Sequence, residues 1–300
     1  MTPFPTVFDS SILSAAKSCH HKFFREYVEH YKPRTLSVHL HAGAAFASGV
    51  EAVRTAFYVE GKPADEALAL GLQRLMVHYG AFECPPDSAK SCERMLGALE
   101  FYFSHYPLGE DGLVPITLPG GRLGIEISFA EPLPIAHPET GDPIIFCGRL
   151  DAAAHYSGGV FGVDEKTTSS LGATWSRQWD LRGQFTGYTW GMKRSANITL
   201  NGFLVRGIAI LKTKYDTQPA ITYRPEWLVD EWFASTCDTI ESLILAWKKS
   251  YWRKAFDHAC DDYGGCAFRA VCQAREPQGW LDTNFQRRVW NPLARTETVL

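Results

Sequence analysis

The sequence predicts an α/β protein with a central sheet, because strand-like segments cluster in its middle, between amphipathic helical segments. The strand-like segments are residues 124–130, 144–156, 160–166 and 198–211. Of the 300 residues, 45% are hydrophobic. That content is enough for a sizeable core, and we expect a single domain over residues 1–300.

Helices are expected on both sides of this cluster in the sequence, where apolar residues recur at helical spacing. The expected helical segments are 10–31, 42–60, 63–80, 86–106, 180–194 and 229–256. Asp87 is the expected cap of the fourth, and residues 61–110 read as a helical insertion. The tail from about residue 276 has few apolar periods and is expected to be irregular.

Composition excludes some classes of protein. The chain has no apolar run of eighteen residues, which argues against a membrane span, and its first residues lack the features of a signal peptide. We therefore expect a cytoplasmic protein. The formal net charge of −3 argues against a protein that coats nucleic acid electrostatically. A nuclease remains possible, since a bound metal cancels the charge of its own ligands.

The segment from Asp151 to Lys166 carries the strongest chemical signal. Two strand-like segments flank Ser157-Gly158-Gly159, which predicts a hairpin. Side chains alternate along a strand, so Asp164 and Lys166 share one face and Glu165 points away. An even loop places Asp151 with Asp164 and Lys166, whereas an odd loop places it with Glu165. Two carboxylates and a lysine form a site that can hold a divalent cation and cleave a phosphodiester.

A helix after this hairpin adds two candidate residues. Gln184 and Tyr188 lie one turn apart in residues 180–194 and share a face. A tyrosine on an apolar helix is otherwise most often a core residue.

Of the eight cysteines, Cys84, Cys92, Cys147 and Cys237 stand alone or in apolar settings. Cys147 lies inside a strand and reads as a small core hydrophobe. Cys260, Cys266 and Cys272 have the spacing C-x5-C-x5-C, and Gly264-Gly265 allows the tight reversal that a metal knuckle needs. A tetrahedral thiolate site needs a fourth ligand, for which Cys19 is the best candidate. Zinc is an alternative, because His20, His21 and His258 lie nearby in sequence, although all three read as surface residues. Three unrelated cysteines are the plain alternative.

The order GRLD, hydrophobic strand, DEKT and Q-x-x-x-Y resembles the PD-(D/E)xK nuclease superfamily in its RecB-like and Cas4-like branch. The resemblance implies a restriction-endonuclease-like core built on a mixed sheet. It also implies that Asp151, Asp164 and the backbone carbonyl of Glu165 bind Mg²⁺ or Mn²⁺. Lys166 would position or activate the attacking water, and Gln184 and Tyr188 would contact DNA or orient the lysine.

The same resemblance extends to two glutamates. The family's helical pattern G-x-x-x-H-x-x-x-E is matched by Gly43 and Glu51, but Ala47 stands where the histidine is expected. Glu51 is a candidate metal ligand, with a solvated helix-face glutamate as the alternative. Glu126 resembles a family position upstream of the hairpin.

The cysteine spacing also resembles this branch, particularly its phage and prophage members. There, one N-terminal and three C-terminal cysteines hold a [4Fe–4S] cluster that joins the two ends of the chain. The resemblance implies such a cluster on Cys19, Cys260, Cys266 and Cys272, with residues 257–275 as the cluster-binding region.

The resulting expectation is a Mg²⁺- or Mn²⁺-dependent deoxyribonuclease, an exonuclease that processes DNA ends in recombination or repair. Its expected partner is DNA, with a recombinase or a single-strand-binding protein as a possible protein partner. Cas4-like trimming or structure-specific endonuclease activity is one alternative. A DNA-binding module that has lost cleavage is another: the intact Asp151, Asp164 and Lys166 oppose it, and Ala47 favours it.

Overall fold

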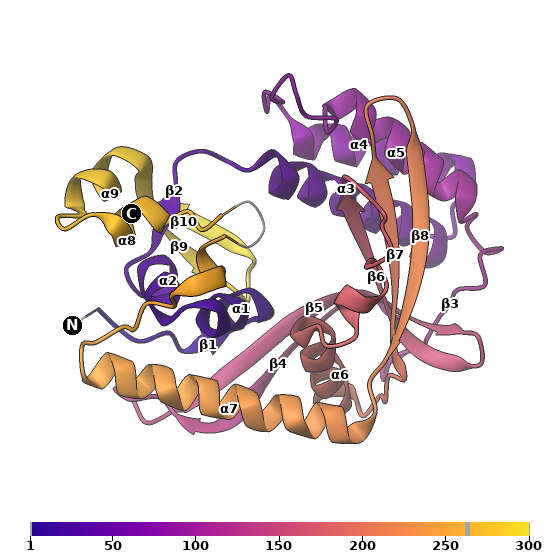
Figure 1. Ribbon diagram of the computed structural model, residues 1–300. Helices are drawn as coiled ribbons and strands as arrows, with labels where there is room; N and C mark the ends of the chain where they lie inside the picture. Colours follow the sequence, from indigo (N-terminus) through magenta and orange to yellow (C-terminus); the bar gives the residue numbers. More distant parts are fainter. Residues whose placement is uncertain (1, 262–264, 300) are drawn as a thin grey trace. The chain divides into compact units, whose positions relative to one another are not determined.

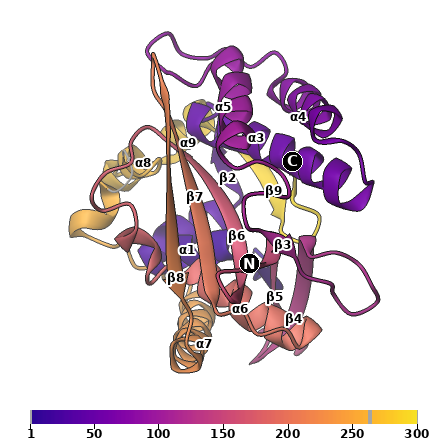
Figure 2. The ribbon, with the colours of Figure 1, turned by 90° about the vertical axis from the view of Figure 1, so that its right-hand side faces the viewer.

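The computed structural model describes residues 2–261 and 265–299, without the side chains of residues 257, 258 and 299. The chain divides into two compact units, each assembled from separate stretches. Unit 1 comprises residues 1–35, 129–148 and 227–300, and unit 2 comprises residues 36–128 and 149–226. Figures 1 and 2 show the elements of both units along the ribbon.

Unit 2 is built on a mixed sheet, as the sequence predicts. Its strands are β3 (Val114–Pro115), the end of β5 (Pro143–Tyr156), β6 (Gly159–Thr168), β7 (Gly202–Ile210) and β8 (Tyr215–Tyr223). The pairs β5–β6 and β7–β8 are antiparallel, whereas β6 and β7 are parallel. The parallel pair is joined through α6 (Gly183–Ala196). The start of β4 (Ile125–Ala136), which pairs with β5, also belongs to this unit.

Three helices cover one face of this sheet: α3 (Val38–Arg54), α4 (Ala64–Tyr79) and α5 (Cys92–His105). A π-helical turn, Thr55–Val59, follows α3. Their buried apolar side chains form one core cluster with Ile208 and Ile210 of β7. On the opposite face, Phe185 of α6 stacks on Phe203 of β7 at 4.5 Å. Because side chains alternate along β7, the two layers of helices lie on opposite faces of the strand.

The helix that was expected to begin after Asp87 begins later. Residues 84–91 are not helical, with a turn at residues 86 and 87, and α5 starts at Cys92. The true cap is Ser91, whose hydroxyl oxygen accepts a hydrogen bond from the Arg94 amide at 3.3 Å.

Unit 1 begins with a short strand and a broken helix. The strand β1 (Val7–Phe8) pairs in parallel with the first part of β5. The segment expected as one helix over 10–31 consists of α1 (Ser10–Ser18), α2 (His20–Phe23) and the π-helical turn Phe24–Val28. The break falls at Cys19, whose backbone is extended. The cysteine thus lies in a gap between two helices rather than on a helical face.

The C-terminal tail is ordered, contrary to the expectation of irregular structure. After α7 (Glu226–Lys248), the 3-10 helix Asp257–Cys260 and α8 (Arg269–Gln273), the chain forms α9 (Gln278–Asn284), β9 (Phe285–Asn291) and β10 (Thr296–Val299). The last two strands join β2 (Tyr31–Pro33) in a second sheet of order β10-β9-β2. Strands that form by pairing with distant segments show little local apolar periodicity, so the sequence pattern does not predict them. Among the described residues, no helix has the length and apolar character needed to cross a membrane.

Candidate functional site

The β5–β6 hairpin brings the predicted acids together. Tyr156 pairs with Gly159, so the loop is the two residues Ser157 and Gly158, with φ of 46° and 80°. Two positive φ values are typical of the type I′ turn, which matches the twist of the flanking strands. Ala152 opposes Val163, the last pair before the strands diverge. Continuing that register places Asp151 opposite Asp164, on the same face, as an even loop requires.

Asp164 and Lys166 form the centre of this site. The Lys166 ammonium lies 2.6 Å from Asp164 Oδ2. Apart from this ion pair, Oδ2 is buried and accepts no hydrogen bond. A buried carboxylate oxygen with one partner has unused capacity to bind a cation. This is the observation that fits a divalent metal at the pair Asp151 and Asp164.

The pKa values of Asp151, Asp164 and Lys166 depend on one another. Burial raises the pKa of Asp151, and the carboxylates of Asp164 and Glu165 raise it further. Burial also raises the pKa of Asp164, against the opposing effect of Lys166. For Lys166 burial lowers the pKa, but Asp164 and Asp151 outweigh burial and leave it raised. The lysine is therefore charged at neutral pH, and the two acids repel each other unless a cation lies between them.

Helix α6 covers the same face of the sheet as Asp164. The amide of Gln184 donates a hydrogen bond to the Tyr188 hydroxyl at 3.3 Å. The Tyr188 side chain is buried, and its charge when ionised is among the influences that raise the pKa of Lys166. The predicted pair thus meets on one helix face, next to the predicted lysine.

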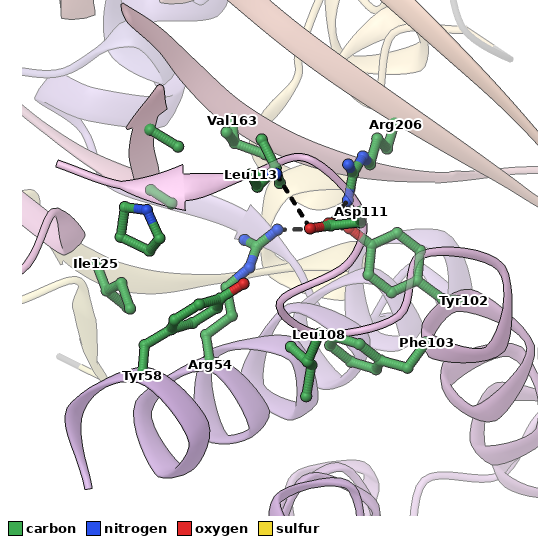
Figure 3. A pocket seen from close by; sticks show the side chains of 13 residues that line it. Arg54, Tyr58, Tyr102, Phe103, Leu108, Asp111, Leu113, Ile125, Val163 and Arg206 are labelled. Carbon is green, nitrogen blue, oxygen red and sulfur yellow. Dashed lines mark hydrogen bonds and ion pairs between the residues drawn. The ribbon is translucent and has the colours of Figure 1, made fainter. Parts of the chain in front are cut away.

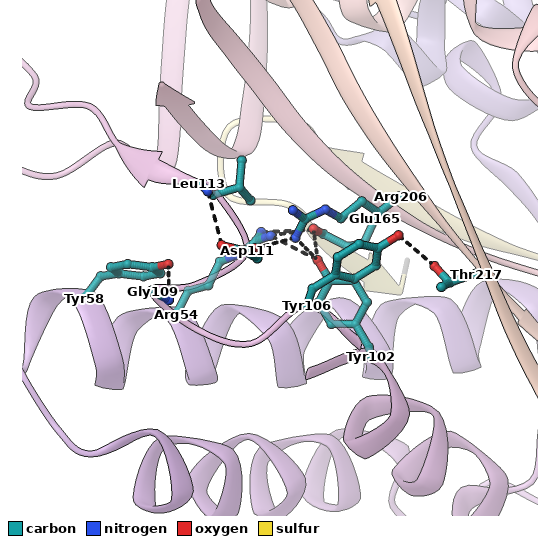
Figure 4. A network of polar contacts seen from close by, with 10 residues as sticks. All are labelled: Arg54, Tyr58, Tyr102, Tyr106, Gly109, Asp111, Leu113, Glu165, Arg206 and Thr217. Atoms are coloured by element: carbon teal, nitrogen blue, oxygen red, sulfur yellow. Dashed lines mark hydrogen bonds and ion pairs between the residues drawn. The ribbon is translucent and has the colours of Figure 1, made fainter. Parts of the chain in front are cut away.

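Glu165 faces the other way, into a buried polar network (Figure 4). Its carboxylate accepts hydrogen bonds from Arg54 at 2.5 and 3.0 Å and from the Tyr102 hydroxyl at 2.7 Å. Arg206 donates to Tyr102 at 3.3 Å and to Asp111 at 2.6 Å. Burial raises the pKa of Glu165, but Arg54, Tyr102 and Arg206 together outweigh burial, so the net pKa is lowered and the group is ionised.

The space beside this network is too small for a ligand. Figure 3 shows the cavity, whose lining includes Arg54, Tyr102, Asp111 and Arg206. Its volume is about 10 Å³, which leaves room for one water at most. The network is therefore a structural support of β6 and α3 rather than a binding pocket.

The two predicted glutamates are held by an arginine. Arg149 pairs with Glu51 at 2.8 Å through one nitrogen and with Glu126 through another. Burial raises the pKa of Glu126 to about 7, and the nearby Glu51 contributes to this rise. Glu51 and Glu126 are thus neighbours of each other and of the hairpin. Ala47, at the position where a histidine is expected, is exposed.

The four predicted cysteines of unit 1 line a single cavity of about 300 Å³. Cys19 Sγ accepts a hydrogen bond from the Ala255 amide at 3.3 Å, and the Cys266 amide donates to the Cys260 carbonyl at 2.9 Å. Burial raises the pKa of Cys266 and of Cys272. Other lining residues include the cations Lys22, Lys254 and Arg269. All eight cysteines are free thiols.

The histidines differ from expectation. His20 is buried rather than on the surface, with its ring nitrogen 3.5 Å from Ser242 Oγ and 3.1 Å from an Arg253 nitrogen. His21 is partly buried and contacts Arg25. Neither lines the cysteine cavity. The side chain of His258, and Gly264 of the predicted reversal, lie outside the described residues.

Neither cluster has the geometry of a complete metal site formed by side chains alone. Over residues 2–261 and 265–299, no three His, Cys, Asp or Glu side chains are gathered as the ligands of one ion. For the cysteines it means that the thiols surround a cavity rather than converge on one point.

Several residues of the site were absent from the sequence-based prediction. Arg149 had a usable signal, since it lies two residues before Asp151 on a predicted strand and shares its face. Arg54 and Tyr102 had none, because they reach Glu165 from helices more than sixty residues away in sequence. Contacts of that kind follow from the fold and leave no local pattern.

Comparison with known proteins finds similarity to solved structures alone. No protein-family model and no curated protein matches the sequence. A solved structure described as a candidate exonuclease from Eubacterium rectale aligns with 85% of this chain and 86% of its own, at 14% identity and a TM-score of 0.45. The protein SSO0001 aligns with 78% of this chain and 84% of its own, at 13% identity and a TM-score of 0.30. Likenesses of this degree do not assign a function, which rests on the residues of the site.

Proposed function

We propose that this protein is a metal-dependent deoxyribonuclease whose active site is the β5–β6 hairpin of unit 2. The observation that carries the proposal is the grouping of Asp151, Asp164 and Lys166 on one face, with a buried Asp164 oxygen that has only the lysine as partner. This grouping follows the G-x-x-D and D-x-K-T order noted in the sequence. Its chemistry fits cleavage of a phosphodiester.

Each residue has a distinct role in this proposal. Asp151, Asp164 and the Glu165 carbonyl would hold Mg²⁺ or Mn²⁺, which, when bound, lowers the pKa of water and neutralises charge on the phosphate. Lys166, kept charged by Asp164 and Asp151, donates hydrogen bonds to the attacking water or to a phosphate oxygen. Tyr188 and Gln184 limit the freedom of the lysine. The network around Glu165 fixes β6, the strand that carries Asp164, the Glu165 carbonyl and Lys166.

The mode of cleavage is proposed from the family resemblance alone. We favour an exonuclease that acts at DNA ends, with a recombinase or a single-strand-binding protein as a further partner. Structure-specific cleavage and Cas4-like trimming are the enzymatic alternatives. The non-enzymatic alternative is a DNA-binding module.

A cleavage assay separates these functions. The purified protein should degrade linear DNA in the presence of Mn²⁺ or Mg²⁺ and spare closed circular DNA. Asp151→Asn, Asp164→Asn and Lys166→Ala should each reduce the rate by about two orders of magnitude or more. The exposed Asp87 provides the control, since Asp87→Asn should leave the rate unchanged. Cleavage of circular DNA would indicate an endonuclease, whereas Lys166→Ala with wild-type activity would refute the assigned mechanism.

The proposal includes a [4Fe–4S] cluster in unit 1, with zinc as the alternative. Supporting it are the four cysteines that line one cavity of about 300 Å³, drawn from an N-terminal segment and a C-terminal one. Cys147 is buried in β5, away from this lining. The cluster would be structural, because hydrolysis of a phosphodiester transfers no electrons. It would join distant parts of the chain and so contribute to folding.

A further inference from the structure

Arg149 occupies the position between two carboxylates that come from separate elements of unit 2. Its guanidinium is 2.8 Å from Glu51 of α3 and also pairs with Glu126 of β4. The side chains are 26% exposed for Arg149, 41% for Glu51 and 19% for Glu126. A planar guanidinium that binds two carboxylates through different nitrogens has a fixed orientation. This is therefore a built contact rather than a mobile surface pair.

The contact lies next to the proposed catalytic acids. Arg149 and Asp151 are two residues apart on β5, so their side chains leave the same face of the strand, about 7 Å apart. Arg149 in turn holds Glu51 and Glu126, which brings both glutamates near Asp151. The carboxylates of Glu51, Glu126, Asp151 and Asp164 thus form one group of neighbouring acids.

The backbone at Glu126 has an unusual conformation. Its φ is 52°, in the left-handed region, although it lies within β4. A non-glycine residue in that region is strained and persists only where its surroundings fix it. The carboxylate of this residue pairs with Arg149.

The position of Arg149 determines how many metal ions this group of carboxylates can accept. Glu51 and Glu126 both form their ion pairs with Arg149, whereas Asp164 pairs with Lys166. A second divalent ion between Glu51 and Glu126 would have to displace the guanidinium, which remains protonated at any working pH.

We propose that Arg149 is a built-in cation that takes the place of a second metal ion between Glu51 and Glu126, so that the site binds one divalent cation. The inference rests on the proposed function, because it assumes that the single ion binds at Asp151 and Asp164. It also assigns Glu51 and Glu126 to holding the arginine rather than the metal. Arg149 is thus a positioning residue that sets the number of ions.

Counting bound Mn²⁺ tests the proposal without any measurement of activity. Free Mn²⁺ is followed by electron paramagnetic resonance during titration of the full-length protein. The wild type should bind one ion, and Arg149→Met should bind two, since the freed carboxylates then form a second site. Arg288, which pairs with Glu297 and has 21% side-chain exposure, provides the matched control: Arg288→Met should still bind one ion.

A second variant covers the case in which Arg149→Met does not fold. Glu51→Gln combined with Glu126→Gln keeps hydrogen-bond acceptors for Arg149, so we expect a folded protein that binds one ion as the wild type does. Two ions in the wild type, falling to one in this double variant, would overturn the inference. One ion in a folded Arg149→Met protein would overturn it as well.

The result that would refute the proposed function differs from the result that would refute the role of Arg149. A wild type that binds no Mn²⁺, or binds one that Asp164→Asn does not weaken, would refute the metal site at the hairpin itself. A wild type with two ions would refute only the role of Arg149, because the hairpin site would still be occupied.

Discussion

Glu165 and Asp164 are adjacent in sequence but have opposite environments. The sequence predicts that they face opposite sides of a strand, and it follows that Glu165→Ala would have little effect on activity. The structure adds that Glu165 is the shared acceptor for Arg54 and Tyr102. The alternation of faces could be predicted, but the importance of the buried partner could not.

We therefore expect Glu165→Ala to destabilise the protein by about 3–5 kcal/mol, because it leaves the buried Arg54 without its counter-charge. Unfolding in urea measures the change. Glu66, which is 54% exposed and pairs with Lys62, is the control, and Glu66→Ala should cost less than about 1 kcal/mol. Equal stability of the Glu165→Ala protein and the wild type would show that the network does not support β6.

Lys90 is a buried cation with a neutral partner. Its side chain donates a hydrogen bond to Thr167 Oγ1 at 3.2 Å, and burial lowers its pKa to about 8. In the unfolded chain a lysine titrates near pH 10.4. The folded state therefore carries an unfavourable charge below pH 8, and this cost disappears as the pH rises toward 10.4.

Lys90→Met should accordingly stabilise the protein at pH 7, by on the order of 2 kcal/mol. The advantage over the wild type should shrink between pH 8 and pH 10, which melting temperatures across that range would show. The exposed Lys212 is the control, since Lys212→Met should give no such trend. A constant difference at every pH would mean that Lys90 is not buried as a cation.

At the scale of the elements, the sequence predicts the hairpin, the helices before it and the helix after it. It fails where structure depends on distant partners. The strand β9 forms because Tyr31–Pro33 lies beside it, and the break at Cys19 interrupts an otherwise continuous helical pattern. Local periodicity carries no information about either feature, whereas the turn at Ser157-Gly158 is encoded in its own residues.

The pairing of β7 with β8 allows a sharp test at Gly202. A Cβ atom there would lie 1.8 Å from the Thr222 carbonyl oxygen of the neighbouring strand, so backbone would have to move. Gly202→Ala should cost about 3 kcal/mol in urea unfolding. At Gly172 a Cβ atom meets nothing within 4 Å, so Gly172→Ala should leave stability nearly unchanged. Similar values for the two variants would contradict the close approach of β7 and β8.

At the scale of the whole molecule, the sequence predicts which cysteines belong to one metal site. The prediction rests on the spacing of the three C-terminal cysteines and on the family resemblance. In the structure, the four predicted ligands Cys19, Cys260, Cys266 and Cys272 line one cavity. The structure also shows that each compact unit carries one of the two candidate sites.

Protein purified without oxygen should therefore be brown, with iron and sulfide in equal amounts. Cys19→Ser, Cys260→Ser, Cys266→Ser or Cys272→Ser should remove the colour and destabilise unit 1. Unit 2 has its own core, so a colourless variant should still bind Mn²⁺. Cys84→Ser, Cys92→Ser and Cys237→Ser are the controls and should stay brown. Stoichiometric zinc without iron would replace the cluster with a zinc site.

The small sheet β10-β9-β2 has a consequence for the order of events during synthesis. Residues 31–33 leave the ribosome early, but their partner strand, Phe285–Asn291, is made some 250 residues later. At about 5–20 residues per second, the delay is roughly 12–50 s. Unit 2 is complete once residue 226 has emerged. The nascent chain must therefore keep Tyr31, which packs against Phe285 in the folded protein, from aggregating until β9 has been made.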